Sequence, residues 1–156
     1  LQLRGKRKGT PIAVRLDGTS DLGLADRFKL PAQFPNIIWY DYTKVPARVS
    51  GEDYRPNRHY TYSASERPES MRVAKLALDN GHSVAAIVSR LPQGSEWSSL
   101  QEAVTGAWAP TTVVDGDETD ARFLDAPGSA RGALVALSVK GGASVRKKLG
   151  AMVFEV

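Results

Sequence analysis

Short, continuously apolar runs that alternate with helix-like segments are the feature that most constrains the fold of this chain. The runs at 36–41 and 83–88 are apolar nearly throughout, with no alternation of polar side chains. A strand of this kind is buried on both faces, as in a parallel sheet covered by helices. We predict strands at 11–16, 36–41, 59–63, 83–88, 111–114, 131–139 and 152–156, and helices at 22–29, 68–80 and near 100–104.

This alternation predicts an α/β fold built from βα units with a mostly parallel sheet. Each strand–helix–strand unit makes a right-handed crossover, which sets neighbouring strands parallel. A chain of 156 residues has the usual size of one domain. We therefore expect a basic N-terminal tail over residues 1–10 and a single α/β domain over residues 11–156. An open sheet leaves edges that need covering, and a homodimer would cover them.

The composition excludes several classes of protein. The chain has no Cys, which rules out disulfides, Cys-ligated metals, iron–sulfur clusters and thiol catalysis. No apolar run approaches the roughly 18 residues that a membrane span requires, so we expect no membrane partner. The basic start of the chain lacks the apolar region of a signal peptide. We expect a cytoplasmic protein.

Positive charge is concentrated at the two ends of the chain. The formal net charge is +4, but seven basic residues lie within 1–8 and 146–148. Without them, residues 9–145 hold 14 basic and 16 acidic side chains, so the body is mildly acidic. Clustered cations neutralise phosphates and release counterions. The candidate nucleic-acid-binding residues are Lys6, Arg7, Lys8, Arg146, Lys147 and Lys148; the alternative is that they form solvated tails that aid solubility.

Ionisable side chains follow the predicted strands. Parallel sheets bind ligands at the carboxyl ends of their strands, and carboxylates that meet there can act as acids and bases. The candidate catalytic residues are Asp17, Asp41, Lys44, Asp115 and Asp117. We expect them around one concave surface, with Asp17 and Asp115 exposed at its rim and contributing little to stability. The alternative is that these residues only form turns and cap helices.

Two further patterns suggest ligands. Asp115, Asp117 and Asp120 have the spacing of an acidic metal loop, so a divalent metal is the cofactor that we consider, although the Gly and Glu of a calcium-binding EF loop are missing. Tyr60 and Tyr62 lie among arginines, a combination typical of single-strand nucleic-acid binding. The alternative for the two tyrosines is packing against a helix, because residues two apart share one face of a strand.

The strand ends together resemble a phage and prophage family, the gene product 88-like proteins. The resemblance covers most of residues 10–140 and rests on Val14–Asp21, Trp39–Lys44, Tyr60–Glu66 and Val114–Asp125. If it holds, we expect this chain to correspond to the C-terminal half of those members that have an additional Cys-containing N-terminal half, and to form part of a TIM-like barrel. It indicates a phage genome context but no particular reaction. Besides the acidic positions above and Lys44, it marks Arg15, Ser63, Glu66 and Arg122, which we take as candidate substrate-binding residues.

Two functional hypotheses follow for such a phage accessory protein. In the first, it is an enzyme or an enzyme-derived domain that acts on nucleotides or nucleic acid through its acidic strand ends. In the second, it is a non-catalytic protein that binds a host protein or nucleic acid. A pocket lined by the strand ends would favour the first hypothesis, whereas dispersed carboxylates and an exposed apolar patch would favour the second.

Overall fold

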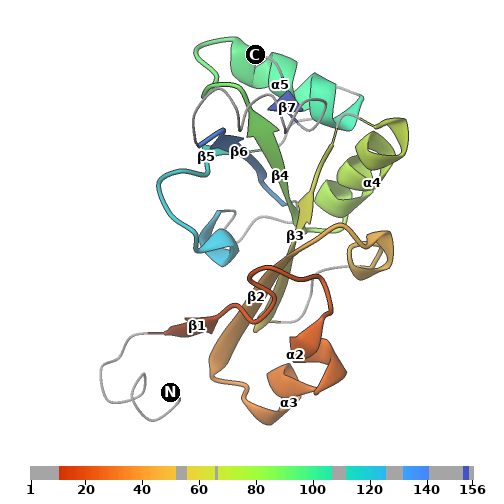
Figure 1. Ribbon diagram of the computed structural model, residues 1–156, viewed down its shortest axis with the longest axis vertical. Coiled ribbons are helices and arrows are strands. Elements are labelled where there is room, and N and C mark those ends of the chain that lie inside the picture. The colour runs from red at the N-terminus through yellow and green to blue at the C-terminus, as the bar shows by residue number, and fades with distance from the viewer. Residues whose placement is uncertain are drawn as a thin grey trace.

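A computed structural model describes residues 11–51, 56–65, 67–106, 112–125, 132–140 and 153–154. Its strands form one sheet in the order β1-β2-β3-β4-β6-β5, with β7 also paired to β4, and every pairing between them is parallel. The sheet curls into a half-barrel with helices between the strands (Figure 1). This confirms the predicted α/β fold with a mostly parallel sheet in part of a barrel. The strands are β1 (Ile12–Val14), β2 (Ile37–Thr43), β3 (Arg58–Ser63), β4 (Ser83–Val88), β5 (Val113–Asp115), β6 (Leu134–Ser138) and β7 (Val153–Phe154).

The register of β2 and β3 divides their side chains between two faces of the sheet. Asp41 pairs with Tyr60 and Tyr42 with Thr61, and partners in parallel strands point to the same face. Tyr60 belongs to the same hydrophobic cluster as residues of the helix at 68–79, so the face of the sheet that carries Tyr60 is called the outer face. Tyr42 lies on the opposite face, called the inner face. The two faces therefore carry different sets of strand-end residues.

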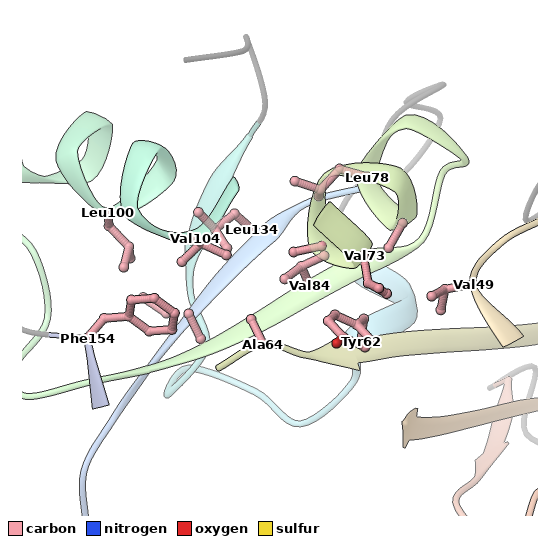
Figure 2. Close-up of a cluster of buried hydrophobic side chains, with 14 of the residues drawn as sticks. Val49, Tyr62, Ala64, Val73, Leu78, Val84, Leu100, Val104, Leu134 and Phe154 are labelled. Atoms are coloured by element: carbon pink, nitrogen blue, oxygen red, sulfur yellow. The ribbon is translucent and has the colours of Figure 1, made fainter. Parts of the chain in front are cut away.

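The main core lies between the outer face and two helices, α4 (Pro68–Asp79) and α5 (Glu96–Thr105). Val73 of α4 packs with Tyr62, while Leu100 of α5 packs with Leu134 and Phe154 (Figure 2). Tyr60 and Tyr62 are each only 5% exposed. The two tyrosines therefore pack against the helical layer, as the packing alternative predicted, and they do not present a single-strand binding surface.

The helix predicted at 22–29 is two short helices, α2 (Leu24–Arg27) and α3 (Leu30–Gln33). Lys29 separates them with a φ of 53°, a left-handed conformation that ends the first helix. Pro31 lies in the first turn of α3, where its missing N–H is not needed. The two helices cover the lower part of the outer face beside β2 (Figure 1).

Two short 3₁₀ turns lie outside the predicted strands and helices: η1 (Pro46–Arg48) after β2, and η2 (Arg122–Leu124) after β5. η2 packs on the inner face, where the Phe123 ring lies 5.6 Å from Tyr40 and 6.1 Å from His59 between ring centroids. No helix in the described ranges has the length and apolarity to cross a membrane. The basic tail predicted at 1–10 lies outside the described residues.

Candidate functional site

Asp17 and Asp41 meet at the ends of β1 and β2, as the parallel topology predicts. The Asp17 N–H donates to Asp41 Oδ1 at 2.9 Å. The Asp17 carboxylate accepts hydrogen bonds from the Ser20 hydroxyl at 2.9 Å and from the N–H groups of Gly23 at 2.6 Å and Leu24 at 3.2 Å. Each aspartate is only 2% exposed. The expectation that Asp17 is an exposed rim residue is wrong, because its carboxylate closes the loop after β1 and caps the start of α2.

The surroundings shift the pKa values of these two carboxyls in opposite directions. Burial raises the pKa of Asp17, but the hydrogen bonds from Ser20, Leu24 and Gly23 outweigh it, so the net shift is downward. Burial dominates for Asp41 and raises its pKa, although the Asp17 N–H and the Arg58 charge act against this rise. Asp17 is therefore held in its ionised form.

Arg58 connects Asp41 to the helical layer. Its side chain is fully buried, with Nη2 at 3.1 Å from Asp41 Oδ2 and Nε at 3.0 Å from Asp26 Oδ2. Its guanidinium lies 3.8 Å from the centroid of the Tyr60 ring, and the Tyr60 hydroxyl donates to the same oxygen of Asp26. Burial and this hydrogen bond raise the pKa of Tyr60 to about 12. Tyr60 is therefore a neutral donor at physiological pH.

A second ion pair links the loops that follow β1 and β2. Asp21 pairs with Arg48 and accepts hydrogen bonds from the Thr43 hydroxyl at 2.9 Å and the Lys44 N–H at 2.7 Å. The Lys44 side chain is exposed, so Lys44 reaches this cluster through its backbone. Gly23 has a φ of 66°, and a Cβ there would lie 2.8 Å from Arg48 Nη2. The left-handed φ favours glycine at this position, and a side chain there would also displace the end of the Arg48 side chain.

A pocket of about 830 Å³ opens between α2, α3, η1 and the outer face of β3. Its polar lining includes Arg58, Tyr60 and Asp26, and its apolar lining includes Leu22, Pro31, Ala32, Ala47 and Pro56. Arg27 and Lys29 also line it; both are exposed, and neither has an ion-pair partner among the described residues. The other two cations, Arg48 and Arg58, are paired with carboxylates. Among the residues that the structure describes, Arg27 and Lys29 are therefore the cations of this lining that have no ion-pair partner.

Arg15 and Arg122, two predicted substrate-binding residues, meet around Tyr42 on the inner face. The Arg15 guanidinium lies 4.6 Å from the centroid of the Tyr42 ring. Burial raises the pKa of Tyr42, and the charges of Arg122 and Arg15 partly offset this rise. Arg122 is 2% exposed, and its Nε lies 3.4 Å from Asp125 Oδ2. Burial raises the pKa of Asp125 to about 6, even though Arg122 acts in the other direction. Sequence reasoning missed Tyr42 and Asp125.

Asp115 and Asp117 lie apart from Asp17 and Asp41, because β3, β4 and β6 separate β5 from β2. Asp115 Oδ1 accepts the Asp117 N–H at 2.8 Å. Asp117 Oδ2 accepts a hydrogen bond from the Ser138 hydroxyl, and Asp117 Oδ1 lies 3.2 Å from Lys140 Nζ. Burial raises the pKa of Asp117, but Ser138 and Lys140 outweigh it, so the net shift is downward. The five predicted catalytic residues thus fall into two groups, and their catalytic roles stay predictions.

The remaining predicted residues are placed as follows. Ser63 ends β3 on the inner face and is half-buried, and Asp120 is exposed. Within the described ranges, no three His, Cys, Asp or Glu side chains could hold one metal ion, so Asp115, Asp117 and Asp120 do not form such a group there. Glu66 and the basic ends lie outside the described residues, namely Lys6, Arg7, Lys8, Arg146, Lys147 and Lys148.

These features define an open parallel α/β half-barrel with an ionic network at the ends of its first strands. The family model described as Gene product 88 matches residues 1–151. The chain belongs to the Gene product 88 family, which confirms the resemblance carried by the strand ends. No curated protein and no solved structure matches the chain.

Proposed function

We propose that this phage-family protein binds a phosphate-bearing ligand, a nucleotide or nucleic acid, in the pocket beside α2 and α3. The observation that carries the proposal is a pair of cations, Arg27 and Lys29, that line a pocket of about 830 Å³ and have no ion-pair partner among the described residues. This volume lies within the usual range for small-molecule sites. Guanidinium and ammonium groups are the side chains that bind phosphate most strongly.

The rest of the lining can orient a nucleotide bound through its phosphate. Leu22, Pro31 and Ala32 offer apolar surface to a base or sugar. Asp26 and Tyr60 offer polar atoms in the same lining, which a ribose hydroxyl or a base edge could contact. An apolar pocket with a few converging polar groups is the usual form of a specific binding site.

Binding is better supported than catalysis at this end of the sheet. The Asp17 carboxylate already accepts three hydrogen bonds, and Asp41 lies beside Arg58. With a pKa of about 12, Tyr60 cannot serve as a base near neutral pH. The carboxylates on β5 belong to a separate group. This dispersal favours the non-catalytic hypothesis.

Isothermal titration calorimetry with adenosine monophosphate and with inorganic phosphate tests the proposal. The parent protein should bind both, and the double variant Arg27→Gln/Lys29→Gln should bind about tenfold more weakly or worse, because each charge-assisted contact contributes about 1.5–3 kcal/mol. The matched control is Arg72→Gln/Lys75→Gln, which removes the same charge from the exposed side of α4. Equal weakening in both variants, or no binding by the parent, would refute binding in this pocket.

A further inference from the structure

We infer that the ligand of this pocket is a single-stranded nucleic acid, and that the Phe28 ring stacks on one of its bases. The inference rests on the proposed phosphate-binding role of Arg27 and Lys29. Phe28 is the residue between these two cations, and it is 59% exposed. An exposed aromatic ring between two phosphate-binding cations combines the two elements of single-strand recognition, stacking and charge.

Three exposed apolar side chains lie in or beside the segment that carries Arg27 and Lys29. Leu22, which precedes α2, is 60% exposed; Phe28, between α2 and α3, is 59% exposed; and Phe34, which follows α3, is 37% exposed. Leu22 lines the pocket itself. Because Arg27 and Lys29 have no ion-pair partner among the described residues, they place two cations beside this apolar surface that a polyanion can bind.

The backbone around Phe28 is held in a fixed conformation. The Phe28 N–H donates to the Leu24 carbonyl at 3.1 Å, and the Lys29 N–H donates to the Asp26 carbonyl at 2.9 Å. The Gln33 side-chain amide donates to the Phe28 carbonyl at 2.6 Å and to the Lys29 carbonyl at 3.4 Å. Because this backbone is already ordered, stacking a base on Phe28 restricts the side-chain rotamers of one residue but requires no ordering of the backbone, which favours binding.

Single strands fit this surface better than duplexes do. A duplex keeps its bases stacked on one another, whereas a single strand exposes base faces to an aromatic side chain. One nucleotide can occupy the pocket with its phosphate near Arg27 and Lys29, while a neighbouring base stacks on Phe28. Stacking on an aromatic side chain tolerates any base, so we expect little sequence preference.

Fluorescence anisotropy with a labelled ten-residue oligothymidylate tests the inference, together with a hairpin duplex of equal charge. Phe28→Ala should weaken oligothymidylate binding by about 5- to 100-fold, the range measured when one stacking side chain is removed, and Phe28→Leu should fall between parent and Phe28→Ala. Calorimetric binding of inorganic phosphate should change less than about twofold, because Phe28 contributes no charge. Leu124→Ala is the control, because Leu124 is 56% exposed but lies on η2; it should bind oligothymidylate as the parent does.

The outcomes separate this inference from the proposed function. If phosphate binds but Phe28→Ala leaves oligothymidylate binding unchanged, the inference is overturned and the proposed function stands. Tighter binding of the hairpin than of the single strand also overturns the inference. Polyglutamate binding that matches the oligothymidylate affinity and depends equally on Phe28 would assign the surface to an acidic protein partner instead. If neither phosphate nor oligothymidylate binds, both proposals fail.

Discussion

Replacing Asp17 by Asn should destabilise the fold, because the Asp17 carboxylate is an internal hydrogen-bond acceptor for three donors. Asn keeps one acceptor oxygen and turns an NH₂ group toward donors at Ser20, Gly23 or Leu24. A hydrogen bond to a charged group contributes about 1.5–3 kcal/mol, and a donor left buried without an acceptor costs about 1–3 kcal/mol. We expect a loss of about 2–4 kcal/mol, which lowers the Tm by roughly 5–15 °C in a domain of this size.

Urea and thermal unfolding followed by circular dichroism measure this loss. Asp120→Asn is the matched control, because Asp120 is exposed, and it should stay within about 0.5 kcal/mol of the parent. The folded pKa of Asp17 lies below its ordinary value of 3.8. Ionised Asp17 therefore stabilises the fold above the unfolded pKa, and this contribution is lost as the pH falls through the folded pKa. In Asp17→Asn, the free energy of unfolding should therefore fall less steeply at acidic pH than in the parent. A variant as stable as the parent that has lost ligand binding would refute the capping role.

Three other predictions concern separate parts of the molecule. Because the folded pKa of Asp125 is raised to about 6, the ionised form opposes folding, so parent stability should fall as the pH rises through about 4 to 6. Asp125→Asn should remove this slope in urea titrations at several pH values, and a retained slope would assign it to another group. Leu100 is 2% exposed in the core, so Leu100→Ala should cost about 2–5 kcal/mol by urea unfolding; a loss below about 1 kcal/mol would contradict this packing. If the basic ends contact nucleic acid, changing their cations to Gln should reduce the dependence of oligothymidylate affinity on salt concentration. An unchanged salt dependence would exclude the basic ends from the nucleic-acid interface. The residues to change are Lys6, Arg7, Lys8, Arg146, Lys147 and Lys148.

Sequence patterns predict the regular elements of the fold well. The β4 strand coincides with the run predicted at 83–88, and α4 ends one residue before the predicted helix at 68–80. Both have strong periodicity or continuous apolar character, which local sequence carries directly. The break at Lys29 was missed because a left-handed φ at a Lys has no sequence signature. The helix near 100–104 begins earlier, at Glu96, where the Glu96 side chain accepts the Gln93 N–H and pairs with Arg90.

The candidate site was predictable only where it depends on neighbouring strands. The contact between Asp17 and Asp41 follows from the parallel pairing of β1 and β2. The separation of Asp115 from Asp17 and Asp41 depends on the order of the strands, in which β6 lies between β4 and β5. The hydrophobic pattern of the sequence does not encode this order. Arg27 and Lys29 were missed because two cations at a helix end are common solvated residues, and only the three-dimensional pocket distinguishes them.

The most direct test of binding in the pocket is a two-dimensional ¹H–¹⁵N NMR titration of the labelled protein with adenosine monophosphate. If the ligand binds there, the amides that line the pocket should show saturable shifts, with the largest shifts at Gly23, Arg27, Lys29 and Arg48. Amides on the inner face, such as that of Tyr42, should stay within the noise. Saturable shifts confined to the inner face, or the absence of any saturable shift, would contradict ligand binding between α2, α3 and η1.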